Sequence, residues 1–166
     1  MRYKKGFTLV EVMVAVVILA ILSAIVSILL IRTLGAAKRA AAVAVVRNEG
    51  AYTMAVLSQS LKFAQSVSNC SSGTQIDMVS GFDNGQTSFR CTNSGGIGGI
   101  ASVSAIMTSK LTSDKVNATS CSIVCPPGTT NEVDINFTLV PSGTSGSITD
   151  TASVNFDMQV FLRNVK

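Results

Sequence analysis

Histidine and tryptophan are absent from this 166-residue chain, and charged side chains make up only 13% of it. Without histidine the chain cannot build a histidine-dependent catalytic triad, a histidine proton relay or a zinc site with histidine ligands. Basic residues come close to clustering only at Lys38, Arg39 and Arg47, which is too sparse for a nucleic-acid footprint. The remaining residues offer no set of nucleophile, base and oxyanion donors. We therefore expect a protein that is not an enzyme, holds no cofactor or metal, and does not bind nucleic acid.

Proline is missing from everything before Pro126, which leaves a long apolar run near the N-terminus uninterrupted. This run, residues 7–31, is 25 positions long and contains Glu11 as its only charged side chain. A helix of that length reaches about 37 Å, enough to cross a hydrocarbon core of about 30 Å with some tilt. Basic residues before the run predict a cytoplasmic N-terminus and an exported remainder. They are Arg2, Lys4 and Lys5.

Glu11 distinguishes three interpretations of the run. A removable signal peptide would have an apolar core of only about 7–15 residues. An uncleaved anchor fits the length but gives no reason for a carboxylate in the membrane, which costs on the order of 2–3 kcal/mol. Cleavage between Gly6 and Phe7 supplies a reason, because the new α-amino group of Phe7 is a cation at the same depth as Glu11. A helix N-terminus also favours a nearby anion.

The segment Gly6-Phe7-Thr8-Leu9-Val10-Glu11-Val12 closely resembles the N-terminal motif of bacterial type IV pilins and of the pseudopilins of type II secretion. In that family a prepilin peptidase cuts after the glycine on the cytoplasmic face and methylates the new N-terminus. The resemblance implies that Gly6 is the recognition residue and Phe7 the methylated first residue. It also implies that Glu11 meets the N-terminus of a neighbouring subunit during assembly.

The resemblance further implies a minor pilin or pseudopilin, a structural subunit of a type IV pilus or a type II secretion filament. Its partners would be other pilin or pseudopilin subunits, the prepilin peptidase, an inner-membrane assembly platform and the membrane. The chain would cross the inner membrane once, with its N-terminus inside and its head outside, before entering a periplasmic or extracellular filament. The alternative is a membrane-anchored extracytoplasmic binding domain that does not polymerise and keeps its leader.

Four segments are predicted along the chain. They are a leader at 1–6, a membrane or filament-core helix at 7–31, an amphipathic continuation of that helix at 32–67 and a β-rich head at 68–166. In the continuation, apolar residues recur every three or four positions on one face, the spacing of a buried helix face. These are Val43, Val46, Gly50, Met54, Leu57, Leu61 and Ala64. Glu49 falls outside this face, where it can be solvated.

Two glycines leave an alternative to the single helix. Gly35 and Gly50 each disfavour helix by about 1 kcal/mol relative to alanine, so two shorter helices broken near either glycine also fit. In favour of one helix, residues 34–46 are rich in alanine, a strong helix former.

Beyond the helix the composition shifts to Ser, Thr, Asn and Gly, with short alternating segments between turns. Residues 74–79 and 87–91 flank a glycine-rich turn containing Asn84 and predict a β-hairpin. Residues 93–99 hold four glycines and are expected to form a loop. Residues 100–111 fit either a strand or a short helix.

Further strands are expected at 116–124, 133–140 and 154–162, with turns at 126–128 and a loop at 141–150. The middle strand alternates most clearly, and its inward side chains would be Val133, Ile135, Phe137 and Leu139. Consecutive strands on short connections favour antiparallel pairing. The predicted fold is therefore α+β: a long N-terminal helix packed on one face of a small antiparallel β-sheet.

Four cysteines lie in the part of the chain that is predicted to be exported: Cys70, Cys91, Cys121 and Cys125. Their even number suits disulfides in an oxidising compartment, and four cysteines permit three pairings. The short spacing of Cys121 and Cys125 before a Pro-Pro turn favours Cys121–Cys125 together with Cys70–Cys91. A four-cysteine zinc site would normally have two closely spaced pairs, and only one such pair is present.

Overall fold

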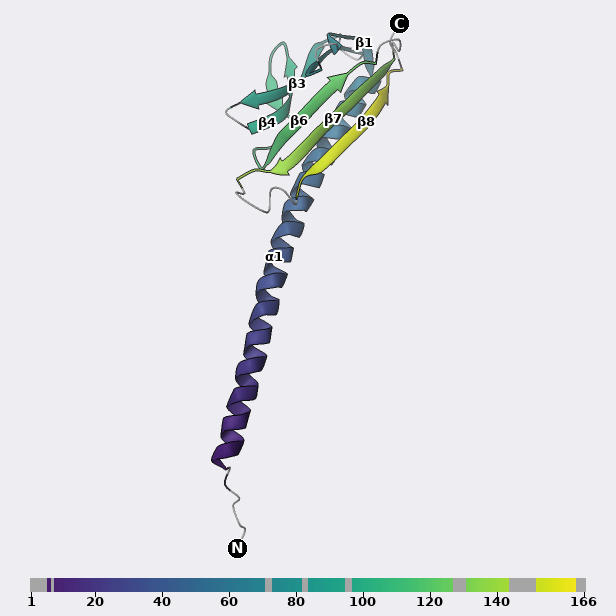
Figure 1. Ribbon diagram of the computed structural model, residues 1–166. Helices are drawn as coiled ribbons and strands as arrows, with labels where there is room; N and C mark the ends of the chain where they lie inside the picture. The colour runs from purple at the N-terminus through teal and green to yellow at the C-terminus, as the bar shows by residue number, and fades with distance from the viewer. Residues whose placement is uncertain are drawn as a thin grey trace. The chain divides into compact units, whose positions relative to one another are not determined.

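The computed structural model describes residues 6, 8–70, 73–81, 84–94, 97–126, 131–143 and 152–163. The chain divides into two compact units, residues 1–40 and residues 41–166. The architecture is α+β, one long N-terminal helix followed by antiparallel strands, as predicted (Figure 1). The predicted turn at 127–128 and most of the predicted loop at 141–150 lie outside the described residues.

Helix α1 runs from Leu9 to Lys62 as one helix of 54 residues. Neither Gly35 nor Gly50 ends it, so the single-helix prediction is confirmed and the two-helix alternative is wrong. The physical reason is local composition: residues 34–46 are rich in alanine, and no proline interrupts the backbone hydrogen bonds.

The predicted end of the helix near residue 67 is wrong, because Ala64–Ser68 form strand β1 instead. Serine and valine are weaker helix formers than the residues before them. The strand also gains a partner: Val67 lies opposite Met78 of β2 in an antiparallel pair. At the junction the amide of Gly81 donates a hydrogen bond of 3.0 Å to the carbonyl of Phe63.

The head contains two antiparallel sheets where the sequence predicted one. The first has the order β1-β2-β3-β4-β5 and the second the order β6-β7-β8. The further strands of the first sheet are β2 (Gln75–Ser80), β3 (Gln86–Ser94), β4 (Ile97–Ser104) and β5 (Thr108–Lys110). Those of the second are β6 (Val116–Val124), β7 (Glu132–Pro141) and β8 (Val154–Phe161). An isolated bridge between Gly73 and Ile123 connects the two sheets.

The predicted hairpin is confirmed as β2 and β3, with Ile76 opposite Phe89, and Asn84 in its turn has a φ of 54°. The loop predicted at 93–99 is wrong in extent, because β3 and β4 continue until Ser94 lies opposite Ile97. Gly98 and Gly99, two of the four glycines that suggested a loop, lie within β4, and a Cβ at Gly98 would overlap the carbonyl oxygen of Ala118 on β6. The ambiguous segment 100–111 is mostly extended, as the end of β4 and the short β5.

The core of the head lies between α1 and the sheets. Strand β7 alternates as predicted, with Val133, Ile135, Phe137 and Leu139 fully buried. In Figure 1 strands β6, β7 and β8 lie side by side across the C-terminal part of α1. Most of the predicted helix face is buried, namely Val46, Gly50, Leu57 and Leu61, together with Ala64 just beyond the helix.

At Gly50, α1 packs directly against the second sheet. A Cβ at this position would overlap the ring of Phe156 on β8. Phe156 in turn stacks on Phe137 with ring centroids 5.1 Å apart. The glycine is therefore a packing residue, and its hydrogen is what lets the aromatic pair lie against the helix.

Candidate functional site

The N-terminus of α1 is organised by Thr8 and Glu11. The amide and the hydroxyl of Thr8 each donate a hydrogen bond of 3.0 Å to the Glu11 carboxylate. In return the amide of Glu11 donates to the Thr8 hydroxyl at 3.3 Å. This reciprocal arrangement is a capping box, in which a threonine before the helix and a glutamate three residues later satisfy backbone amides that have no partner in the helix.

The capping box holds the Glu11 carboxylate beside the start of the helix. Gly6, two residues before Thr8, is exposed, and no atom lies within 4 Å of where its Cβ would be. Phe7 lies outside the described residues, so the predicted cleavage and methylation site is represented only by Gly6. The role of Thr8 was not predicted, although the spacing Thr8-x-x-Glu11 is a recognisable signal for it.

Around this acid, α1 presents a continuous apolar surface. Large apolar side chains from Leu9 to Leu34 are exposed by half or more, and no described residue of the chain covers them. By length and composition the helix can cross a membrane. Covering a Val, Leu or Ile side chain contributes about 1.5–3 kcal/mol, so this surface requires lipid or other protein around it.

The few hydroxyls in this apolar run are satisfied within the helix itself. Ser23 donates to the carbonyl of Ala20 at 2.9 Å, and Ser27 donates to the carbonyl of Ser23 at 2.8 Å. Side chains that bond to their own helix need no water, which suits a hydrocarbon environment. Glu11 is different. Thr8 donates hydrogen bonds to its carboxylate, but among the described residues no cationic side chain forms an ion pair with it.

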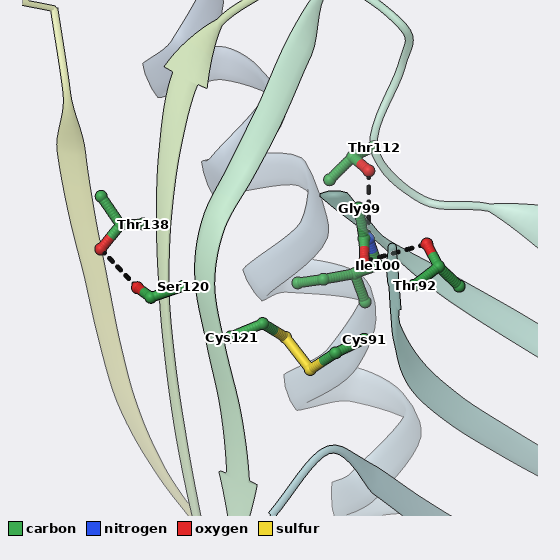
Figure 2. The surroundings of a disulfide bond; sticks show 8 residues. All are labelled: Cys91, Thr92, Gly99, Ile100, Thr112, Ser120, Cys121 and Thr138. Carbon is green, nitrogen blue, oxygen red and sulfur yellow. Dashed lines mark hydrogen bonds between the residues drawn. A yellow bond between two sulfur atoms is a disulfide. The ribbon is translucent and has the colours of Figure 1, made fainter. Parts of the chain in front are cut away.

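The four cysteines form two disulfides within the head, and the predicted pairing is wrong. The pairs are Cys70–Cys125 and Cys91–Cys121, with Cα–Cα distances of 5.5 and 5.9 Å. Figure 2 shows Cys91–Cys121 joining β3 of the first sheet to β6 of the second. Cys70 and Cys125 likewise lie just beyond β1 and β6.

The predicted disulfide between Cys121 and Cys125 fails for a geometric reason. Cys121 lies within β6 and Cys125 one residue past its end, and a strand rises about 3.3 Å per residue, so four residues span about 13 Å. That exceeds the Cα–Cα range of about 4.4–6.8 Å that a disulfide tolerates. Short spacing in the sequence therefore excludes this pair once the segment is a strand.

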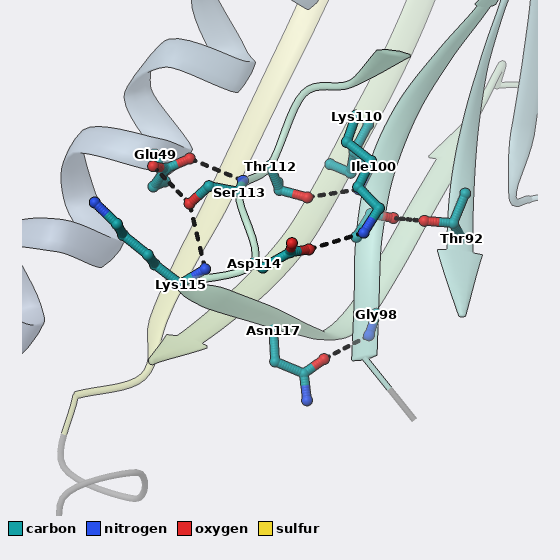
Figure 3. A network of polar contacts seen from close by, with 11 residues as sticks. Glu49, Thr92, Gly98, Ile100, Lys110, Thr112, Ser113, Asp114, Lys115 and Asn117 are labelled. Atoms are coloured by element: carbon teal, nitrogen blue, oxygen red, sulfur yellow. Dashed lines mark hydrogen bonds and ion pairs between the residues drawn. The ribbon is translucent and has the colours of Figure 1, made fainter. Parts of the chain in front are cut away.

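A polar network fastens the loop after β5 to the helix (Figure 3). The amide and hydroxyl of Ser113 donate hydrogen bonds of 3.1 and 2.8 Å to the two oxygens of Glu49. Glu49 lies outside the predicted buried face, but it is partly buried and its carboxylate is bound by Ser113. The buried Thr112 hydroxyl accepts a 3.1 Å bond from the amide of Ile100. The hydrogen bonds of Ser113 and Thr112 therefore order the segment between β5 and β6, which connects the two sheets.

The outer face of the first sheet carries a second polar cluster, around Asp77. Its carboxylate accepts hydrogen bonds from Asn69 at 3.0 Å and from Gln75 at 2.7 Å. A hydrogen bond from Ser88, with smaller contributions from Gln75, Asn69 and the charge of Arg90, holds the pKa of Asp77 below its usual value. This carboxylate is engaged within the sheet, and in the described residues no group of three His, Cys, Asp or Glu side chains is arranged to hold a metal.

Comparison with known proteins adds one finding at the N-terminus. Residues 1–27 match the family model of the prokaryotic N-terminal methylation motif, the signal motif of type IV pilins and pseudopilins. The match covers the Thr8–Glu11 capping box and most of the exposed apolar surface. No curated protein and no solved structure matches the chain significantly.

Proposed function

We propose, starting from the methylation motif at residues 1–27, that this chain is a minor pilin or pseudopilin, a structural subunit of a type IV pilus or type II secretion filament. The motif implies processing by a prepilin peptidase and association with the membrane. On this proposal Gly6 is the recognition residue, Phe7 becomes the methylated N-terminus, residues 7–31 form the membrane and filament-core segment, and the head is exported.

The observation that supports this function best is the position of Glu11. Within the apolar run 7–31, whose exposed side chains require an apolar cover, it is the only charged residue. An unpaired carboxylate in such surroundings is costly, and a cation supplied by a neighbouring subunit would offset that cost. The α-amino group created by cleavage before Phe7 is such a cation, and every subunit of a filament would carry one.

Assembly then follows from two complementary features on each subunit. Glu11 of one copy would pair with the N-terminus of another, while the apolar surfaces from Leu9 to Leu34 would pack together and replace lipid. Small residues on the run, including Ala15, Ala20 and Ala24, would let the helices approach closely. An inner-membrane assembly platform would be the partner that moves subunits from the membrane into the filament.

The test separates the charge of Glu11 from its role in the helix cap. Glu11→Ala removes both, whereas Thr8→Ala removes the cap hydroxyl and keeps the carboxylate. Loss of the cap alone costs about 1 kcal/mol of helix stability. We expect Glu11→Ala to abolish incorporation into filaments, measured as the sheared filament fraction, and Thr8→Ala to reduce it only modestly. Equal loss in both variants would assign the effect to the cap, and unchanged incorporation of Glu11→Ala would refute the assembly role.

The mass of the N-terminal peptide from native cells tests processing directly. A peptide that begins at Phe7 and carries one added methyl group is expected. An intact Met1 would favour the anchored extracytoplasmic binding domain that does not polymerise. A start near residue 36 would mean removal of an ordinary signal peptide and would contradict the proposed function.

A further inference from the structure

Basic side chains follow the apolar run 7–31 directly. Arg32 is the first residue after the run, and Lys38 and Arg39 lie about two turns further along the same helix. All three are exposed, and among the described residues none of them forms an ion pair. The sequence has no acidic residue between Glu11 and Glu49. The positive charge of this part of the helix is therefore uncompensated.

Arg32 and Arg39 lie on one side of the helix with a hollow between them. Their spacing is close to two full turns, or about 10 Å along the helix axis. Gly35 and Ala36 between them are small, and no atom lies within 4 Å of where a Cβ at Gly35 would be. These four residues line a hollow of about 470 Å³. Since a water molecule takes up about 30 Å³, the hollow has room for a phosphate group between the two guanidinium groups.

The depth of this hollow matches the headgroup layer of a bilayer. On the proposed function residues 7–31 span the hydrocarbon core, so the boundary of the core on the exported side falls near Ile31. At about 1.5 Å per residue, Gly35 and Ala36 lie about 6–8 Å beyond Ile31. The polar layer on each side of the core is about 5–8 Å thick. The hollow and the lipid phosphates therefore lie at the same depth.

Basic residues at this end of the span need a specific explanation. With the N-terminus inside, Arg32, Lys38 and Arg39 lie on the exported side, whereas Lys and Arg beside membrane spans are concentrated on the cytoplasmic side. A lipid phosphate would supply the missing negative charge. Arginine suits it, because the guanidinium group always carries its charge and can donate two parallel N–H bonds to phosphate oxygens.

We propose that the hollow between Arg32 and Arg39 binds the phosphate of an anionic phospholipid in the leaflet on the exported side, and that Lys38 adds to the attraction. The proposal rests on the membrane placement of residues 7–31 in the proposed function, and it concerns the chain before it enters a filament. A subunit that leaves the membrane must then release this lipid.

The lipid selectivity of the full-length chain in bilayers tests the proposal. The purified chain is reconstituted into phosphatidylcholine vesicles that contain a trace of spin-labelled phosphatidylglycerol or spin-labelled phosphatidylcholine. Electron spin resonance then gives the fraction of each label that the protein immobilises. We expect the combined change Arg32→Gln and Arg39→Gln to lower the preference for phosphatidylglycerol about fivefold or more, since one Arg or Lys beside an anionic surface has an effect of this size.

The matched control is the combined change Arg47→Gln and Lys62→Gln. It removes the same charge from two exposed positions further along the same helix, and it is expected to leave the preference unchanged. Equal loss in both double variants would mean that net charge alone attracts the lipid. An unchanged preference in the Arg32 and Arg39 variant would mean that the hollow holds no lipid. Either result would overturn the proposal.

Competition with a free anion separates a lipid phosphate from a soluble one. Millimolar inorganic phosphate, added at constant ionic strength, is expected to leave the preference for phosphatidylglycerol unchanged. Displacement of the labelled lipid by inorganic phosphate would assign the hollow to the free anion and would also overturn the proposal.

Resistance to alkaline carbonate extraction, measured on the same vesicles, separates this proposal from the proposed function. A chain that is extracted does not span the bilayer, and the membrane placement of residues 7–31 then fails together with the lipid site. A chain that resists extraction while its Arg32 and Arg39 variant keeps the full preference overturns the lipid site alone.

Discussion

Single residues decide how closely α1 and the sheets of the head approach each other. Gly50 and Gly35 lie on the same helix and have the same intrinsic cost for helix formation. Their surroundings differ, because a Cβ at Gly50 would overlap Phe156 whereas a Cβ at Gly35 would have no neighbour within 4 Å. The same substitution at the two positions therefore distinguishes the effect of helix propensity on stability from the effect of packing.

Gly50→Ala is expected to destabilise the head despite its better helix propensity. The propensity gain is about 1 kcal/mol, and displacing the stacked Phe156 and Phe137 rings costs more than this, since overpacking of a core costs about 1–3 kcal/mol and sometimes more. Thermal unfolding of the full-length chain in detergent, followed by circular dichroism, measures the difference.

Gly35→Ala is the matched control and is expected to leave the unfolding temperature of the head unchanged. A Gly50→Ala protein as stable as the wild type would show that β8 can move away from α1 at little cost. The close packing inferred at this position would then be wrong.

At the scale of elements, one disulfide joins two strands of the head, and the other joins the segments that follow β1 and β6. Cys91–Cys121 connects β3 to β6, and the pairs close loops of 55 and 30 residues. Constraining the unfolded chain through loops of this length stabilises a protein by about 3–4 kcal/mol for each disulfide in the chain-entropy account.

Replacing Cys91 and Cys121 together by serine is expected to lower the free energy of unfolding by about 3 kcal/mol, because the unfolded chain regains the freedom that the disulfide removes. Denaturant unfolding of the variant and the wild type gives this difference. The paired replacement leaves Cys70–Cys125 intact, so no thiol remains to exchange with it.

Peptide mapping without reduction provides the control for the pairing itself. Peptides linked through Cys70–Cys125 and through Cys91–Cys121 are expected. Recovery of a peptide closed by Cys121–Cys125 would contradict the strand geometry of β6.

At the scale of the whole molecule, the chain combines two units with opposite surface chemistry. Residues 1–40 expose an apolar helix surface, whereas residues 41–166 form a compact unit with its own buried core. The apolar surface of the first unit requires lipid or other protein around it, and the second unit is cross-linked by two disulfides.

A chain that begins at Ala37 is therefore expected to fold in an oxidising compartment and remain soluble without detergent. It retains the buried helix face from Val46 to Leu61 and both disulfides. Circular dichroism and disulfide mapping, compared with the full-length chain in detergent, check the outcome. Aggregation of this shorter chain, or scrambled disulfides in it, would show that the head depends on residues 1–36.

The sequence by itself determined the features that depend on neighbouring residues. The apolar run with Glu11, the single long helix and strands β6, β7 and β8 all follow from local composition and periodicity, which act over a few positions. The capping box belongs to this group as well, because Thr8 and Glu11 are only three residues apart.

Only the tertiary structure decided which distant segments meet. The disulfide pairing, the division of the strands into two sheets, the Glu49–Ser113 contact and the fit of Gly50 against Phe156 all join residues far apart in the chain. Periodicity shows which face of a strand or helix is buried, but the partner of that face depends on the register and packing of other elements. The early end of α1 has the same cause, since Ala64–Ser68 became a strand by pairing with β2.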